Sequence, residues 1–198
     1  MANLGSSTDS FRTLHQPHIQ ELFFDPVEEK GVKVIHVDQK DDRGVDIVLD
    51  ICDQNSASKL ANLDVRSVIC SNLLEHIHNP KDLADLLKEM IPQGGYLAIS
   101  VPHSYPYHPD PIDTMYRPTP EEIAAMFPEF KVVSKNLVEC GTLYDKITQN
   151  PYKVLRMLAR SLVPFIKFRG WLSTMHHWVW LNRKYRVSCV ILQKTACE

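Results

Sequence analysis

The sequence lacks the cysteine patterns that carry most disulfide and zinc chemistry. Its five cysteines are scattered along 198 residues, odd in number and without Cys-x-x-Cys spacing. Such usage argues against a disulfide framework and against a thiolate zinc site, and it is typical of a reducing compartment. We therefore expect a cytoplasmic protein with no bound metal.

The sequence also has no long apolar run and no secretory signal. Its first residues are polar and rich in serine, and the aromatic-rich stretch 150–184 is broken too often by charge and proline to span a bilayer. A hydrophobic content of 44% and a charged content of 23% are ordinary for a soluble globular domain. We expect one domain over residues 1–198, with about 150–184 inserted as a basic helical segment before the last strand.

Glycine is scarce where a nucleotide-binding fold usually needs it. Residues 1–4 predict a short or clipped first strand, and the turn after it, Gly5-Ser6-Ser7-Thr8, holds a single glycine. The Gly-x-Gly-x-x-Gly fingerprint of dinucleotide-binding domains is absent, which disfavours a nicotinamide-dependent oxidoreductase. The hydroxyl side chains suit either a ligand or the cap of the next helix. That helix is predicted from about Asp9 to Phe24, ending before Asp25-Pro26.

Residues 67–118 contain the clearest pattern in the chain. The β-branched run Val68–Cys70 predicts a buried strand, and apolar residues spaced by three and four from Leu83 to Met90 predict a helix. Gly94-Gly95 ends that helix, and Tyr96–Val101 predicts the next strand, closed by the proline that follows. A helix between two buried strands implies a right-handed crossover in a parallel sheet.

Further strands are predicted on both sides of this unit. Val32–Asp38 predicts a strand that ends in an acid, and Gly44–Asp53 predicts the third strand and its exit loop. The ranges 130–137 and 185–193 predict the sixth and the last strand. Thr119-Pro120-Glu121-Glu122 predicts a helix start with a capping box. In open parallel sheets, ligands bind beyond the carboxyl ends of the strands. The segments that lie there include 71–76 and 102–118.

The segments SNLLEHIHNP and LLKEMIPQGGYLAISVP resemble the fourth strand, helix and fifth strand of class I S-adenosylmethionine (SAM)-dependent methyltransferases of the type 11 kind. The resemblance extends over about residues 3–136 and returns in the last strand. It implies an α/β fold, a Rossmann-like three-layer sandwich with a mostly parallel seven-stranded sheet and an antiparallel last strand. It also implies SAM as the cofactor, and methyl transfer to an oxygen or nitrogen atom of a small molecule, a sugar or a glycolipid head group.

The same resemblance assigns cofactor contacts. Gly5–Ser7 would form the turn beside the cofactor, and Asp38 would accept hydrogen bonds from the ribose hydroxyls. Asp50 would accept from the adenine amino group while Ile51 covers the ring, with Asp53 as a substitute for Asp50. Two alternatives stay open, since Asp38 also suits a solvated turn and Asp50 also suits the cap of the next turn. The predicted cofactor contacts are Gly5, Ser6, Ser7, Asp38, Asp50, Ile51, Ser71, Asn72 and Leu73.

The loop 102–117 is denser in functional groups than a connector needs. Its prolines stiffen it, its histidines suit the removal of a proton from an acceptor, and its tyrosines suit stacking on a sugar or an aromatic face. The pair Glu75-His76 faces the same cleft or forms a structural hydrogen bond. The loop lacks the helical His spacing of a metal site. The predicted catalytic residues are His76, His103 and His108, and the predicted substrate contacts are Tyr105, Tyr107, Asp110, Asp113, Tyr116 and Arg117.

The C-terminal part of the chain is basic. After Asp145 the sequence has ten Lys and Arg residues and one acid, Glu198. Segment 150–184 mixes these bases with Trp and Phe, which suits the surface of an anionic membrane, a partner groove, or a lid over the active site. No known nucleic-acid-binding motif accompanies the charge, so we expect no nucleic-acid partner. The alternative function is therefore a non-catalytic methyltransferase-like scaffold that binds a partner or the inner face of a membrane; the sequence predicts no oligomeric state.

Overall fold

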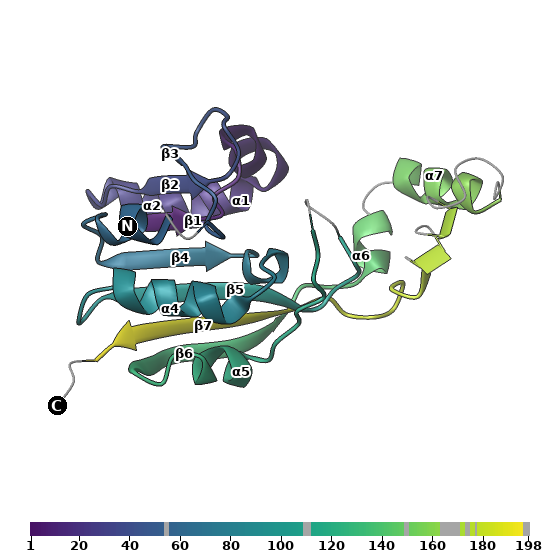
Figure 1. The fold of residues 1–198 in the computed structure, drawn as a ribbon. Coiled ribbons are helices and arrows are strands. Elements are labelled where there is room, and N and C mark those ends of the chain that lie inside the picture. Colours follow the sequence, from purple (N-terminus) through teal and green to yellow (C-terminus); the bar gives the residue numbers. More distant parts are fainter. Residues whose placement is uncertain are drawn as a thin grey trace.

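The computed structural model describes residues 1–53, 56–108, 112–148, 151–162, 171–172, 175–176 and 178–195 (Figure 1). Within these residues the strands form one seven-stranded sheet in the order β3-β2-β1-β4-β5-β7-β6. The strands are β1 (Ala2–Leu4), β2 (Ile35–Asp38), β3 (Ile47–Val48), β4 (Ser67–Ser71), β5 (Tyr96–Ser104), β6 (Phe130–Glu139) and β7 (Arg186–Lys194).

Strands β1 to β5 are mutually parallel, and β7 lies between β5 and β6, antiparallel to both. This arrangement confirms the predicted Rossmann-like sheet with an antiparallel last strand. It also confirms the short first strand, because β1 has three residues, all buried, and lies between β2 and β4. The parallel order places the carboxyl ends of β1, β2, β4 and β5 along one edge of the sheet.

Helices and helical turns flank this sheet. Helix α4 begins at the proline after Asn79 and buries Leu83, Leu86, Leu87 and Met90, as the apolar spacing predicts. At α5 the Thr119 side chain accepts from the Glu122 N–H, and the Glu122 carboxylate accepts from the Thr119 N–H, so the predicted capping box is present. The elements are η1 (Phe11–His15), α1 (Pro17–Ile19), η2 (Gln20–Phe24), α2 (Asp25–Glu29), α3 (Ser56–Ala61), η3 (Leu74–His76), α4 (Pro80–Met90), α5 (Pro120–Ala125), α6 (Leu143–Thr148) and α7 (Pro151–Ser161).

Three predicted boundaries are wrong. The first helix is divided into short π-helical and α-helical pieces and continues through Asp25-Pro26, with the proline where the π-helical piece η2 passes into α2. Strand β3 is reduced to Ile47–Val48, since only these residues pair with β2. Strand β5 continues past Pro102, which pairs with Val187 just before a register shift; an irregularity of this kind tolerates a proline within a ladder.

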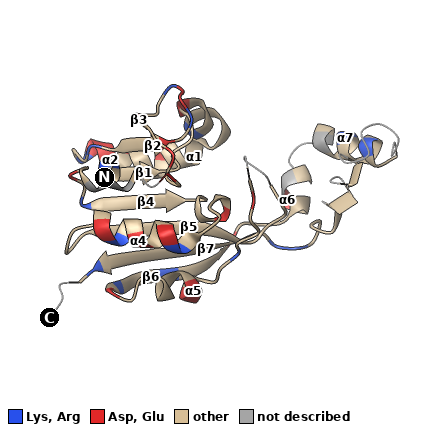
Figure 2. Ribbon diagram, in the orientation of Figure 1, with Lys and Arg blue, Asp and Glu red and all other residues tan. Residues whose placement is uncertain are grey.

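Charge is distributed unevenly over the fold. Figure 2 shows Asp and Glu on α4, on α5 and in the loop after β2, and basic residues on α7. Helix α7 extends away from the sheet, beyond the end at which β5 and β7 reach α6 (Figure 1). Every helix in the described ranges falls short of the length and apolarity needed to cross a bilayer.

Candidate active site

The turn after β1 brings together three carboxyl ends of the sheet. The N–H groups of Gly5 and Ser6 donate to the Val37 carbonyl at 2.9 and 3.1 Å, and the Ser7 N–H donates to Asp38 Oδ2 at 2.7 Å. Gly5 has φ +69°, and a Cβ added there would lie 2.8 Å from Cδ1 of Leu73. Only glycine therefore fits between this turn and the segment that leaves β4. Five predicted cofactor contacts, Gly5, Ser6, Ser7, Asp38 and Leu73, form one neighbourhood.

Asp38 is 7% exposed, and its carboxylate holds the start of the loop after β2. In addition to Ser7, the Lys40 N–H donates to its Oδ1 at 3.0 Å. Each carboxylate oxygen accepts two hydrogen bonds, so both oxygens retain accepting capacity toward a ligand. The ribose contact of Asp38 stays a prediction that this geometry allows.

Arg12 in η1 also organises the turn, and the sequence analysis did not identify it. Its guanidinium is buried and donates to the carbonyls of Ser6 at 2.9 Å, Ser7 at 2.8 Å and Gly44 at 2.8 Å. Burial lowers the pKa of Arg12, and nearby acids, Asp9 foremost, raise it. One buried cation thus joins the serine-rich turn to the loop after β2. Nothing in the spacing of a single arginine signals that role.

Asp50 and Ile51 follow β3 next to this neighbourhood. The Leu49 N–H donates to the Asp38 carbonyl at 2.8 Å, which places the end of β3 beside the end of β2. Asp50 Oδ1 accepts from the Cys52 N–H at 2.8 Å, and Ile51 packs, partly buried, against the core. The observed contacts are those of a turn cap, the alternative stated above. An adenine contact stays a prediction for both residues.

The segment after β4 leads from the turn to a second group of side chains. Ser71 Oγ lies 2.9 Å from Ser100 Oγ, and the Asn72 N–H donates to the Ser100 carbonyl at 2.8 Å, so this segment is held against β5. Asn72 adopts φ +50°, which turns the chain into η3. Within η3, Leu74 and Glu75 are buried, and the partly buried His76 follows them.

Glu75 is fully buried at the centre of the second group. Its carbonyl accepts from both the N–H and the hydroxyl of Thr114, at 2.8 and 2.9 Å, which ties η3 to the loop before α5. Its Oε1 lies 3.7 Å from Nε2 of His76 and 3.8 Å from Nε2 of His108. Neither carboxylate oxygen has a hydrogen-bond partner within the described part of the chain.

Asp113 fixes the loop around His108. It accepts from Arg117 Nη2 at 2.6 Å, from the His108 N–H at 3.0 Å and from the Met115 N–H at 2.8 Å. Burial would raise the pKa of Asp113, but these donors, Arg117 foremost, lower it to about 2. Contact with Glu75 raises the pKa of His108, against burial, which lowers it. The Asp113 carboxylate is therefore ionised where its Oδ2 lies 3.2 Å from His108 Nδ1.

The remaining predicted substrate residues divide between this group and other surroundings. The Tyr105 ring lies 5.1 Å, centroid to centroid, from both His108 and Tyr185, so Tyr105 belongs to the group. Tyr107 is exposed beside it. His103 Nδ1 lies 3.2 Å from the Pro118 carbonyl, and the Tyr116 hydroxyl donates to Met126 Sδ at 3.3 Å, toward α5. Asp110 lies outside the described residues.

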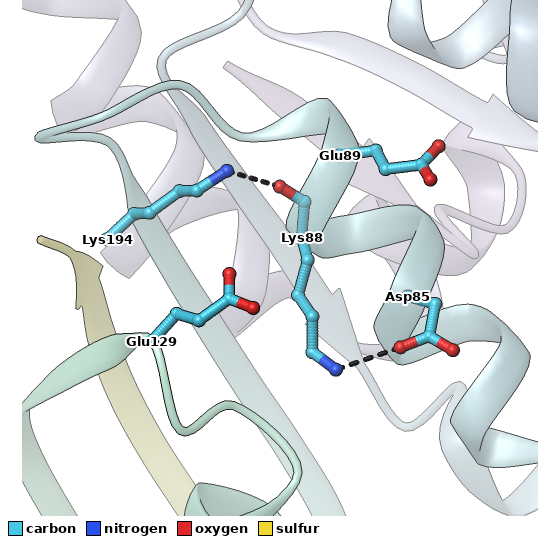
Figure 3. Close-up of a pocket in the computed structure, with 5 residues that line it drawn as sticks. All are labelled: Asp85, Lys88, Glu89, Glu129 and Lys194. Carbon is cyan, nitrogen blue, oxygen red and sulfur yellow. Dashed lines mark hydrogen bonds and ion pairs between the residues drawn. The ribbon is translucent and has the colours of Figure 1, made fainter. Parts of the chain in front are cut away.

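A surface hollow at another place is not part of this site (Figure 3). Lys194 follows the pairing of Gln193 with Tyr96, at the amino end of β5, whereas the site lies beyond the carboxyl ends. The hollow is polar, with a Lys88–Asp85 ion pair of 2.8 Å, and Lys194 Nζ donates to the Ile91 carbonyl at 3.0 Å. Its lining residues are Asp85, Lys88, Glu89, Glu129 and Lys194.

Comparison with known proteins gives matches in structure alone. No family model matches the sequence, and no curated protein matches it. The structure of coclaurine N-methyltransferase bound to N-methylheliamine and SAH is similar over 98% of this chain and 65% of that chain, with a TM-score of 0.50 and 14% identity. The structure of MccD protein is similar over 98% of this chain and 89% of that chain, with a TM-score of 0.50 and 14% identity.

The chain has the class I methyltransferase fold. It spans less than two thirds of the length of coclaurine N-methyltransferase, so that enzyme's activity does not transfer with the fold. The [4+2]-cyclase SpnF, similar over 99% of this chain and 75% of that chain with a TM-score of 0.52 and 10% identity, illustrates the same point. A methyltransferase fold leaves the reaction open, and the function has to be argued from the site.

Proposed function

We propose that this protein is a SAM-dependent methyltransferase that acts on an oxygen or nitrogen atom of a small molecule, a sugar or a glycolipid head group. One observation carries the proposal. The turn Gly5–Ser7 with Asp38 and the group around Glu75 are joined by the segment 71–76, so a place for a nucleoside and a place for an acceptor are adjacent at one edge of the sheet.

The residues of the turn fit the cofactor. Asp38 has accepting capacity for ribose hydroxyls, and the absent side chain of Gly5 leaves the turn in close contact with Leu73. Once bound there, SAM supplies a methyl group on a positively charged sulfur. Leu73 would lie beneath it, and Ser6 and Ser7 would line its edge. Holding the acceptor in line with that methyl group supplies several kcal/mol of the rate enhancement.

The histidines beside Glu75 would prepare the acceptor. His76 Nδ1 contacts the Ile112 carbonyl, and His108 Nδ1 lies 3.2 Å from Asp113 Oδ2. Both acceptors require a proton on Nδ1, so each neutral ring keeps its lone pair on Nε2, which lies 3.7 Å (His76) or 3.8 Å (His108) from Glu75 Oε1. His108 is the better placed base, because the carboxylate of Asp113 stabilises the imidazolium that proton transfer produces. Tyr105 would contact a ring of the acceptor.

Calorimetric titration with SAM and with S-adenosylhomocysteine tests this function. Asp38→Ala should weaken binding about ten- to a hundredfold, because a hydrogen bond to a charged group contributes about 1.5–3 kcal/mol. Asp41→Ala, an exposed acid in the same loop, is the matched control and should leave the affinity unchanged. Absence of binding at millimolar ligand would remove the proposal, and equal affinities for both variants would remove the ribose assignment.

The surface of α7 supports a second, scaffold-like function. Leu155, Leu158 and Leu162 recur at helical spacing and are 65%, 46% and 82% exposed, with Arg156 and Arg160 among them. An exposed apolar stripe flanked by bases suits the surface of an anionic bilayer. In a flotation assay, the protein should then rise with vesicles that have anionic head groups. The triple variant Leu155→Ser, Leu158→Ser, Leu162→Ser should remain in the bottom fraction. Equal flotation of both would exclude this contact.

A further inference from the structure

The buried Glu75 carboxylate needs a positive partner that the described residues do not fully supply. Both oxygens are shielded from solvent and have no hydrogen-bond donor within the described ranges. Buried polar groups in native proteins are almost always paired, and a buried charge without a partner costs several kcal/mol. At 3.7 and 3.8 Å the two imidazole Nε2 atoms are too distant for normal hydrogen bonds. The space between them and Oε1 is the place for a cation.

We propose that Glu75, His76 and His108 bind a divalent first-row transition metal such as Zn²⁺, whose open coordination positions bind an oxygen atom of the acceptor. One ligand atom from each residue lies within 4.8 Å of the others. Metal bonds of about 2.0–2.2 Å hold neighbouring ligands about 3.0–3.5 Å apart. The two imidazoles therefore need to approach Oε1 by a few tenths of an ångström, and each other by at most about 1.3–1.8 Å, which rotation of the rings supplies.

The surroundings of the two histidines favour metal binding. The Ile112 carbonyl at His76 and the Asp113 carboxylate at His108 can only accept, so each Nδ1 carries the proton and each Nε2 is free to ligate. Metal-bound histidines almost always have such a partner on the other ring nitrogen. Asp113 is itself held by Arg117 at 2.6 Å, which fixes the orientation of the His108 ring.

The donor set indicates the class of metal and leaves room for a ligand. Two imidazoles and one carboxylate are the ligands of catalytic zinc sites and of non-haem iron sites, both of which keep open positions. The histidine side chains are 17% and 32% exposed while Glu75 is fully buried, so the open side faces solvent. This is the side at which the acceptor would enter. No metal was expected because the loop 102–117 lacks helical His spacing. The ligand set instead joins His108 to Glu75-His76 across 31 residues of intervening chain (108 minus 76, less one), which no local spacing reveals.

The role in acceptor binding rests on the proposed methyltransferase function, whereas metal binding itself does not. A hydroxyl oxygen bound to such a metal loses its proton more readily, as metal-bound water does. With a metal bound, His108 Nε2 is a ligand and no longer the base, so the proton leaves to solvent at the open side of the site. The metal thus selects acceptors with a hydroxyl or another oxygen donor. Without a metal, a protonated His108 would be left to balance Glu75, and the cluster would be an ion pair with no affinity for cations.

Titration of chelator-treated protein with Co²⁺ alone, followed by visible absorption, tests the site. We expect one Co²⁺ per chain, with a spectrum typical of fewer than six ligands. Glu75→Gln and His108→Ala should each weaken binding by about tenfold or more, while the exposed His78→Ala, a matched histidine variant, should bind like the wild type. Asp113→Asn should weaken it about 10–100-fold through the His108 ring.

Circular dichroism of each variant distinguishes loss of a metal-binding side chain from loss of the fold. Displacement of bound Co²⁺ by Zn²⁺ in the wild type is a second readout, which needs no variant. Failure of the wild type to saturate with either ion by about 1 mM overturns the proposal. Binding that persists unchanged in both Glu75→Gln and His108→Ala also overturns it. Titration with S-adenosylhomocysteine is a separate assay. A protein that binds Co²⁺ but not S-adenosylhomocysteine refutes only the methyltransferase function. A protein that binds S-adenosylhomocysteine but not Co²⁺ refutes only the metal site.

Discussion

Asp113 gives the sharpest test of how the site is held together. Its pKa is about 2 in the folded chain, against an ordinary value of 3.8. A carboxyl with a depressed pKa stabilises the fold fully above its unfolded pKa and loses that contribution as the pH falls through the folded pKa. The difference of 1.8 (3.8 minus 2) corresponds to about 2.5 kcal/mol at pH 7 and to about half of that at pH 3.

Asp113→Asn, measured by urea unfolding in the presence of a chelator, should therefore lower the free energy of unfolding by about 2.5 kcal/mol at pH 7 and by about 1.3 kcal/mol at pH 3. Asp85→Asn is the matched control, because Asp85 pairs with Lys88 at the surface and is 70% exposed; it should cost less than about 0.5 kcal/mol. A loss that does not change between the two pH values would refute the assignment of the stabilisation to the ionised carboxylate.

Three further changes probe the turn and the fold. Gly5→Ala should lower the free energy of unfolding by about 1–3 kcal/mol, because φ is positive there and the new Cβ would meet Leu73. Adding Leu73→Ala to this variant should recover part of the lost stability. Absence of recovery in urea unfolding would contradict the steric explanation. Arg12→Met should cost about 2–4 kcal/mol, since three carbonyls lose their donor, whereas Arg43→Met, 90% exposed, should stay within about 0.5 kcal/mol in thermal unfolding. Equal effects of the two arginine variants would show that Arg12 is not a structural cation. Thr119→Ala should cost about 1 kcal/mol by the same method, and no loss would mean that the capping box does not stabilise α5.

The parts of the fold that the sequence predicts well are those set by local periodicity. Helix α4 and the strands on either side of it follow from apolar spacing and from the glycines after the helix, and the capping box at Thr119 is a contiguous signal. The short β3 depends on pairing with β2, and the continuation through Pro26 depends on where a helical turn begins. Neither is visible in a local pattern.

The same distinction, between features set by local sequence and features set by long-range contacts, applies to the candidate site. The neighbourhood of Gly5, Asp38 and Leu73 was predicted from the resemblance to class I methyltransferases, in which these segments follow neighbouring strands. The sequence shows that Glu75 and His76 are adjacent, but it does not show that His108 reaches them. That contact depends on the hydrogen bonds of Thr114 to the Glu75 carbonyl. Arg12 is missed for the same reason, because its three acceptors come from two different loops.

The position of β7 has a consequence for synthesis on the ribosome. Among the described strands β6 pairs with β7 alone, and β7 begins 47 residues after β6 ends (186 minus 139). At 5–20 residues per second the nascent chain carries a finished β6 for roughly 2 to 10 s before its neighbour emerges. During that interval β5 and β6 each present an open edge, at which two growing chains on one messenger can join. Insertion of β7 thus covers the open edge of β5 and one edge of β6 in a single step.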